Sequence, residues 1–377
     1  MPKNRPSGPG AAPGATAAPR HGRLSGGRPV VLVLRALGLG DLLTAVPALR
    51  ALRRALPEHE LVLAAPRELA PVARATGCVD RLLDASGPGR SVPALLPGEA
   101  RGPHLAVNLH GRGPASHRLL AGLGPERLWA FRHPEVPGVR GPAWIPDEHE
   151  RLRWCRLLRW YGPAADPDDV LIAPPAGARS PLPGAVVVHP GAQAAARRWP
   201  VDRFAAVVRG VRRAGLPVLV TAGPGEGPLA RSVAEHAGLP PSAVMGGDGA
   251  GEGIPFEELC GLVAAARCVV VGDTGLAHLA TALGTRSVVL FGPVSPALWG
   301  PPENGRHRAL WHPGHGPAAG SPGDPHADRP DPRLLEITVD EVLEAVLALS
   351  ASAAPAADAG RPTDAGRPAP VVEAASR

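Results

Sequence analysis

The chain has 377 residues, which is enough for two domains that each bury a core of their own. Its formal net charge is +6, but residues 1–28 hold five basic side chains and no acidic one. The rest of the chain is therefore almost neutral, and its arginines are interleaved with acids. Because no basic stripe with interleaved aromatic residues is present, the composition argues against a nucleic-acid-binding protein.

The cysteines and the apolar runs bear on the cellular compartment. None of the four cysteines, Cys78, Cys155, Cys260 and Cys268, has C-x-x-C spacing, which predicts reduced thiols. The basic N-terminus lacks the apolar core of a signal peptide. The longest apolar run, 30–34, is too short to span a bilayer. We expect a soluble, monomeric, cytoplasmic protein; peripheral contact with the inner face of the membrane stays open.

Both ends of the chain have a biased composition. Residues 1–28 and 351–377 are rich in Pro, Gly and Ala and lack hydrophobic periodicity, which predicts disordered tails. A third segment of this kind, 312–332, predicts a long loop.

Between the tails, short apolar strands alternate with amphipathic helices, and this pattern occurs twice. In the first half we expect strands at 29–34, 60–65 and 104–110, and helices up to about 56, near 67–76 and near 115–122. In the second half we expect strands at 185–191, 217–223, 268–273 and 287–292, and helices at 200–214, 226–237, 255–267 and 274–283. Such alternation is typical of α/β folds whose parallel sheets carry helices on both faces.

The domain boundaries follow from this pattern. The first domain is expected at 29–165, ending after an amphipathic helix at 149–162, and a Pro-rich linker follows at 166–183. The second domain is expected at 184–336, and a last amphipathic helix at 337–350. Ligands in doubly wound sheets bind at the carboxyl ends of the strands, so we look for the site there.

The first turn of interest is Gly38-Leu39-Gly40-Asp41, directly after the first strand. A dinucleotide fingerprint, G-x-G-x-x-G, would need a third glycine at Leu43, so a nicotinamide site is disfavoured. Asp41 has two interpretations at this point. It is either a helix cap, because Asp is favoured at a helix N-terminus, or a base that faces a cleft.

The second half contains the features of an anion site. Arg197 and Arg198 follow a strand, and guanidinium groups bind phosphate oxygens well. Gly272-Asp273 ends another strand, and Thr274-Gly275-Leu276 begins a helix whose free N–H groups can bind a pyrophosphate. His278 lies on the same face as Thr274, and Glu226, at a further helix start, can accept hydrogen bonds from a ribose. The alternatives are solvated charges, helix caps and a packing histidine.

Three segments in this order resemble glycosyltransferase family 9, the ADP-heptose:lipopolysaccharide heptosyltransferase family. They are "GLGDLLTAVPALRALRRALP", "HPGAQAAARRWP" and "GDTGLAHLATALGTRSVVLFGP". The resemblance spans roughly 30–350 and implies a GT-B fold, in which two Rossmann-like domains face a cleft. It further implies an inverting transfer without a catalytic metal, from a nucleotide-diphosphate sugar held by the second domain to a hydroxyl acceptor held by the first. ADP-heptose is the family's default donor, and a glycan or small molecule is the acceptor.

The resemblance also implies roles for single residues. Asp41 matches the general base, and Arg197 stands where the family has a lysine that contacts the diphosphate. Gln193 stands where Ser or Asn is commoner, and Val294 where Thr is common. The donor-side set is Gln193, Arg197, Glu226, Asp273, Thr274, Gly275, Leu276 and His278; the acceptor-side set is Gly40, Asn108, His110 and Arg112. The last helix, 337–350, is implied to pack back toward the first domain.

Two other functions remain open on the sequence. A GT-B nucleotide-sugar epimerase would share the pyrophosphate site and use no acceptor hydroxyl. A non-catalytic nucleotide-sugar-binding protein would need no base at Asp41. A metal site is not expected, because His307, His312 and His315 are irregularly spaced in a Gly/Pro-rich loop.

Overall fold

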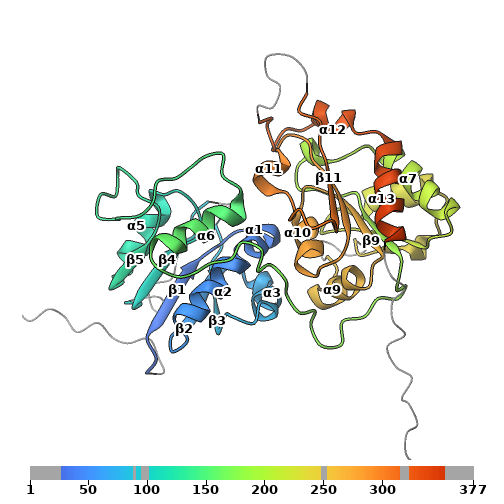
Figure 1. The fold of residues 1–377 in the computed structure, drawn as a ribbon. Coiled ribbons are helices and arrows are strands. Elements are labelled where there is room, and N and C mark those ends of the chain that lie inside the picture. Colours follow the sequence, from blue (N-terminus) through green and yellow to red (C-terminus); the bar gives the residue numbers. More distant parts are fainter. Residues whose placement is uncertain (1–26, 88–90, 95–101, 248–252, 315–321, 353–377) are drawn as a thin grey trace, which may run out of the picture.

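The computed structural model describes residues 27–87, 91–94, 102–247, 253–314 and 322–352 (Figure 1). The two expected tails lie almost wholly outside these ranges, as does part of the expected loop at 312–332. Arg28 belongs to the folded part, because its guanidinium donates hydrogen bonds to the carbonyls of Pro57, Glu58 and His59.

The first domain is built on a five-stranded parallel sheet in the order β3-β2-β1-β4-β5 (Figure 1). Its strands are β1 (Val30–Leu34), β2 (Glu60–Ala65), β3 (Arg81–Asp84), β4 (Leu105–Asn108) and β5 (Arg127–Trp129). Its helices are α1 (Leu39–Thr44), α2 (Val46–Ala55), the 3-10 turn η1 (Arg67–Leu69), α3 (Ala70–Ala75), α5 (Ala115–Gly122) and α6 (Glu150–Trp160). All five residues of β1 are buried, as expected for a central strand of a sheet covered on both faces.

The second domain contains a six-stranded parallel sheet in the order β11-β10-β9-β6-β7-β8. Its strands are β6 (Val186–His189), β7 (Val218–Thr221), β8 (Val244–Met245), β9 (Cys268–Gly272), β10 (Ser287–Leu290) and β11 (His307–Leu310). Its helical elements are η3 (Ala195–Arg197), α7 (Val201–Arg213), α8 (Gly227–His236), η4 (Pro241–Ala243), α9 (Phe256–Ala264), α10 (Gly275–Ala282), α11 (Pro296–Trp299), α12 (Pro332–Glu336) and α13 (Val339–Ala351). The expectation of two Rossmann-like domains is confirmed.

Several details differ from the sequence-based expectation. The strands β3, β5, β8 and β11 were not expected; they are two to four residues long and lie toward or at the sheet edges, where the apolar signal is weak. The single helix expected up to about 56 is two helices, because Pro47 in the first turn of α2 favours a new helix start.

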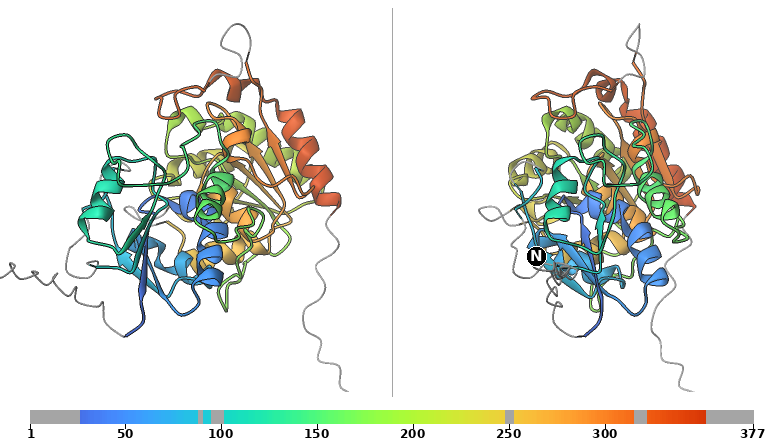
Figure 2. Two further views of the ribbon diagram at one scale, coloured as in Figure 1. Left: turned by 60° about the vertical axis from the view of Figure 1, so that its left-hand side comes forward. Right: turned by 90° about the vertical axis from the view of Figure 1, so that its left-hand side faces the viewer.

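The resemblance implies that the last helix packs toward the first domain, but α13 packs on the second domain. The apolar face of α13, with Val342, Val346 and Leu349, is buried in the core of the second domain together with residues of α7 and β10. Leu343 approaches Gly210 of α7 so closely that a Cβ at Gly210 would lie 2.6 Å from Leu343 Cδ2. Figures 1 and 2 show α13, in red, on the side of the second domain that faces away from the first. Packing against its own sheet therefore positions this helix.

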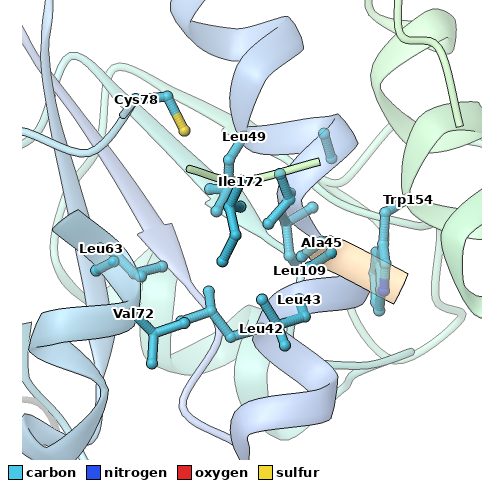
Figure 3. Packing of buried hydrophobic residues seen from close by; sticks show 14 of the residues in the cluster. Leu42, Leu43, Ala45, Leu49, Leu63, Val72, Cys78, Leu109, Trp154 and Ile172 are labelled. Atoms are coloured by element: carbon cyan, nitrogen blue, oxygen red, sulfur yellow. The ribbon is translucent and has the colours of Figure 1, made fainter. Parts of the chain in front are cut away.

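The two domains share one apolar cluster. It contains Leu42 and Leu49 of the first domain, Leu276 and Leu279 of α10, and Ile172 of the linker. Figure 3 shows the part of this cluster around α1 and α2, with Leu42, Leu43 and Leu49 among its members. Burial of apolar surface from both sides thus holds α1 against α10, and this contact places the two sheets relative to each other.

No helix in the described part of the chain has the length and apolar character needed to cross a bilayer. All four cysteines are buried and free, and burial raises the pKa of Cys155, Cys260 and Cys268 to about 12.

Candidate active site

A cleft of about 460 Å³ lies between the domains, next to the carboxyl ends of β1, β6 and β9. Its walls include most of the residues that the sequence singled out. From the first domain come Gly40 and Asp41, and from the second come Gln193, Arg197, Glu226, Asp273, Thr274, Gly275, Leu276 and His278. The fold therefore brings together segments more than 200 residues apart in the sequence, and it does so where doubly wound sheets bind ligands.

The N-termini of α1 and α10 meet at one edge of this cleft. A Cβ at Gly40 would lie 2.6 Å from His278 Cδ2, and a Cβ at Gly275 would lie 3.2 Å from Leu39 Cβ. Glycine is therefore needed at both positions for the helices to approach this closely. Both helix starts carry free N–H groups and positive dipole ends, which together favour an anionic ligand between the domains.

Asp41 occupies the first turn of α1 and lines the cleft. Its Oδ2 accepts a hydrogen bond from the Gly38 N–H at 3.2 Å, and its Oδ1 lies 3.7 Å from Arg35 Nη2. The side chain is about 10% exposed, on the cleft side. The two interpretations of Asp41 are thus compatible, because a carboxylate that caps the helix also faces the ligand space.

The start of α10 has the features of a diphosphate site. Thr274 is the N-cap, but its side chain makes no cap hydrogen bond, and its Oγ1 is buried without a partner among the described residues. Arg197 reaches over from η3, where its Nη1 donates to the carbonyl of Asp273 at 3.2 Å while its buried Nε has no partner in the same described part. Two buried donors beside a helix N-terminus fit a phosphate group. Arg198 instead donates from Nε to the carbonyl of Ala192.

Glu226 lies at the other end of the cleft, in a niche between two turns. Its Oε2 accepts the Gly223 N–H at 2.9 Å and lies 3.5 Å from His189 Nε2. A Cβ at Gly191 would lie 1.9 Å from that same oxygen, so this glycine makes room for the carboxylate. Burial lowers the pKa of His189 although the Glu226 charge opposes this, and His189 Nδ1 lies 3.2 Å from the carbonyl of Thr221, which can only accept. A neutral His189 that donates from Nδ1 to Thr221 has no proton on Nε2, so the donor that holds the Glu226 carboxylate is the Gly223 N–H.

His278 lies on α10 at the seam between the domains. Burial lowers the pKa of His278 to about 4, against the opposing effect of the Asp41 charge. Its ring meets the edge of the Trp299 ring, with 5.8 Å between centroids. It is therefore neutral near pH 7, and it both lines the cleft and packs against Gly40.

The remaining acceptor-side residues do not line this cleft. Asn108 is fully buried; its Nδ2 donates to Ser116 Oγ at 2.9 Å and its Oδ1 accepts the His110 N–H at 2.9 Å. Asn108 thus shapes the turn after β4 that carries His110 and the exposed Arg112. An acceptor role for Asn108, His110 and Arg112 stays a prediction.

Arg112 faces a second hollow, of about 780 Å³, in the first domain. Arg132 and Arg140 line it too, together with the rings of Trp144 and Trp160. Trp160 is 63% exposed. Within the described ranges, none of these three arginine side chains has an acidic partner or a hydrogen bond, so three positive charges face a partly apolar hollow.

Sequence reasoning missed several residues. His189, Trp299 and His326 also line the cleft. His189 ends β6 and begins the quoted segment HPGAQAAARRWP, Trp299 ends α11, and His326 lies in a loop. Arg35 and Glu150 lie behind Asp41; the signal for Arg35 was a charged residue directly after a fully buried strand.

The histidines considered for a metal site are not all in a loop, because His307 begins β11, and both His307 and His312 have protein partners. His307 Nδ1 lies 2.9 Å from Ser287 Oγ, and His312 Nε2 lies 3.0 Å from Glu341 Oε1, while His315 falls outside the described residues. Over the part of the chain that the structure describes, no group of three or more His, Cys, Asp or Glu side chains is placed to hold a metal ion.

The family comparison covers the second domain. Residues 176–319 match the model of glycosyltransferase family 9 (heptosyltransferase). Lipopolysaccharide heptosyltransferase 3 of Escherichia coli is 30% identical over 121 residues, which are 32% of this chain and 34% of that protein. The chain thus spans about a third of the length of this relative. The resemblance to family 9 that the motifs indicate is confirmed.

Solved structures show the same fold over both domains. A glycosyl transferase family 9 protein from Veillonella parvula superposes with a TM-score of 0.69 at 18% identity, over 86% of this chain and 98% of its own. The ADP-heptose lps heptosyltransferase II of E. coli gives 0.67 at 19% identity, over 85% and 98%. The E. coli heptosyltransferase WaaC, solved with ADP, gives 0.62 at 16% identity, over 85% and 99%. The chain therefore has the GT-B fold that the resemblance implies.

Proposed function

We propose that this chain, whose residues 176–319 match glycosyltransferase family 9, is a glycosyltransferase that moves a sugar from a nucleotide-diphosphate donor to a hydroxyl acceptor. One observation carries the proposal: a carboxylate of the first domain and an anion site of the second line the same cleft. A transferase needs both groups at one place, because the acceptor must be deprotonated where the leaving group departs.

The donor side of the proposal rests on α10 and η3. The N–H groups of Thr274, Gly275 and Leu276, the Thr274 hydroxyl and the Arg197 guanidinium would bind the diphosphate. The carboxylate of Glu226 would accept hydrogen bonds from the ribose, and Gln193 and Asp273 line the same cleft. Two of the structural relatives are described with ADP-heptose or ADP, which supports ADP-heptose as the first donor to test.

The chemistry that we propose is one displacement with inversion. Asp41 accepts the proton of the acceptor hydroxyl while that oxygen bonds to C1 of the sugar. The bond from C1 to the diphosphate oxygen breaks on the opposite face, and the nucleoside diphosphate leaves with the electron pair. The α10 N–H groups and Arg197 stabilise the charge that develops there, which is the role that a metal ion has in other transferases. Positioned base catalysis contributes about 10²–10⁴-fold.

The acceptor side of the proposal rests on the first domain. Asp41 and Gly40 mark the place of the reacting hydroxyl, and the loop shaped by Asn108 and His110 carries Arg112 toward the second hollow. Arg112, Arg132 and Arg140, which have no acidic partner among the described residues, support an acceptor with an anionic group, because a hollow with three guanidinium groups binds negative charge favourably.

A donor panel tests the proposal. Purified full-length protein is heated with a series of nucleotide-diphosphate sugars and with the matching nucleoside diphosphates, and the unfolding temperature is recorded. We expect one or a few donors to raise it, because a ligand that binds only the folded state stabilises that state. The stabilising donor, radiolabelled in the sugar, is then incubated with phosphorylated or carboxylated glycan acceptors. Failure of every donor to stabilise the protein would contradict the proposal.

A further inference from the structure

A buried cluster of charged side chains lies behind Asp41, outside the wall of the cleft. Arg35, directly after β1, is fully buried, and Glu150, in the first turn of α6, is 5% exposed. Neither residue lines the cleft. Charged side chains are rarely buried to this extent unless they are paired, since the loss of hydration costs free energy. This cluster therefore calls for an explanation beyond packing.

Arg35 binds both ends of the segment that carries Asp41. Its Nε donates to the Asp41 carbonyl at 2.9 Å, and its Nη2 donates to Thr44 Oγ1 at 3.2 Å. The Thr44 hydroxyl in turn donates to the same Asp41 carbonyl at 2.9 Å. Arg35 Nη1 donates to the carbonyl of Leu109, which follows β4, at 2.5 Å. The guanidinium thus fixes the first turn of α1 against two neighbouring strands.

Glu150 fixes Arg35 from the opposite side. Its Oε1 accepts from Arg35 Nη2 at 3.0 Å and from the Trp154 indole N–H at 2.9 Å. Its Oε2 accepts from Arg153 Nη1. The Trp154 ring also packs on Arg35, with 4.8 Å from the guanidinium carbon to the ring centroid. Both oxygens of Glu150 are therefore occupied by donors, and the carboxylate has one defined position.

We propose that Arg35 and Glu150 are positioning residues for the Asp41 carboxylate: Arg35 holds it at the cleft, and Glu150 shares the charge of Arg35. The same Arg35 Nη2 that donates to Glu150 lies 3.7 Å from Asp41 Oδ1. Glu150 thus accepts from the same guanidinium nitrogen that faces Asp41, and this fixes where that nitrogen lies. This inference rests on the proposed role of Asp41 as the base.

Loss of either side chain should change the surroundings of the Asp41 carboxylate. Without Arg35, the first turn of α1 loses the donors to the Asp41 carbonyl and to Thr44 Oγ1. Without the Glu150 charge, Arg35 Nη2 loses the acceptor that fixes its position beside Asp41. Both changes reach Asp41 through Arg35, which does not line the cleft.

Other charged groups near Asp41 stay constant between these variants. His278 of α10 interacts electrostatically with Asp41, and it is itself influenced by His149, Arg151 and Arg35. Arg153 is paired with Glu150. Arg197 and Asp273 line the facing wall of the cleft, where Arg197 Nη1 donates to the Asp273 carbonyl.

Carbon-13 NMR of protein labelled at the aspartate carboxyl carbons tests this directly, with the Asp41 signal assigned by its loss in Asp41→Asn. The variants are Glu150→Gln, which keeps the shape of the side chain, and Arg35→Gln. The control is Glu148→Gln, which removes a similar bidentate ion pair with Arg156, at 2.7 Å, two residues away from Glu150. We expect the Asp41 carboxyl signal, recorded at one pH near neutrality, to move in Glu150→Gln and in Arg35→Gln and to stay unchanged in Glu148→Gln.

The Glu150→Gln spectrum decides the proposal by itself, should Arg35→Gln fail to fold. An Asp41 signal that does not move in Glu150→Gln would overturn it. The signal is recorded without turnover, so it tests the positioning role even if the protein transfers no sugar, an outcome that would overturn only the proposed function.

With an active donor, a kinetic test adds a second readout. Glu150→Gln is expected to lower kcat about 10-fold while the donor Kd changes less than about twofold, because only the placement and basicity of Asp41 are altered. Arg35→Lys, which keeps the charge but loses the forked geometry, should restore part of the kcat that Arg35→Gln loses. A loss of donor binding in Glu150→Gln with kcat unchanged would contradict the inference.

Discussion

The two domains supply the cleft by different means. The second domain offers mainly backbone: the start of α10, glycines at 191, 223 and 275, and one guanidinium, Arg197. The first domain offers a single carboxylate, Asp41, next to two buried charged residues, Arg35 directly after β1 and Glu150 of α6. The proposed anion site thus depends on local turn geometry, whereas the proposed base depends on residues 115 positions apart in the sequence. Substitutions in the two domains should therefore affect different steps.

Removal of the base should have the largest effect. In Asp41→Asn the side chain keeps its shape and can still accept from the Gly38 N–H, but it cannot take a proton. We expect transfer to fall by about 10²–10⁴-fold, with the donor Kd nearly unchanged. Donor titration by calorimetry and a radiolabelled product assay on the same preparation measure both quantities. Unchanged turnover would rule out the base role and leave the first domain without a catalytic group.

The complementary change in the second domain is Arg197→Ala. Loss of the Arg197 guanidinium removes a charge-assisted hydrogen bond to the diphosphate, so the donor Kd should rise about 10- to 100-fold. Arg198→Ala is the matched control, since Arg198 binds the Ala192 carbonyl and does not line the cleft. Equal donor affinity in both variants would mean that Arg197 does not contact the donor.

The pH dependence of the free energy of unfolding should depend on two buried histidines, one at the domain interface and one at the edge of the second sheet. Burial lowers the pKa of His278, at the seam, and of His307, on β11, from 6.5 to about 4. Between these values the unfolded chain binds a proton that the folded chain does not, so stability is full above pH 6.5 and is lost as the pH falls toward 4. Each histidine should lower the free energy of unfolding by about 2 kcal/mol between pH 7 and pH 5.

Urea unfolding at the two pH values checks this. His278→Gln and His307→Gln should each flatten the pH dependence, and only His278→Gln should also alter donor binding. A pH dependence that both variants leave intact would show that other groups control acid stability.

The smallest effect is expected at the second hollow. Arg132→Gln should raise the acceptor KM about fivefold for a phosphorylated or carboxylated acceptor, since an exposed ion pair contributes up to about 1 kcal/mol. The donor Kd should not move. Arg213→Gln, an exposed arginine on α7, is the control. Equal acceptor KM values in the two variants would remove the hollow from the acceptor site.

The candidate site residues of the second domain can be predicted from the sequence better than those of the first, for a physical reason. Phosphate binding needs glycines, a helix start and a nearby cation within one turn, so Thr274, Gly275 and Arg197 are visible as short motifs. The proposed acceptor contacts come from side chains on separate loops, so Arg132 and Arg140 carry no motif. Arg35 and Glu150 become partners only through the tertiary fold. Short edge strands such as β5 lack a continuous apolar run, and the position of α13 follows from which sheet covers its apolar face.

The central claim is that Asp41 and the α10 anion site face one donor from opposite domains. A crystal structure of the protein with a non-transferable analogue of the stabilising nucleotide sugar tests this most directly. We predict diphosphate oxygens within hydrogen-bond distance of Thr274 Oγ1 and Arg197, with C1 of the sugar exposed toward the Asp41 carboxylate. A diphosphate bound elsewhere, or a sugar whose C1 faces away from Asp41, would contradict it.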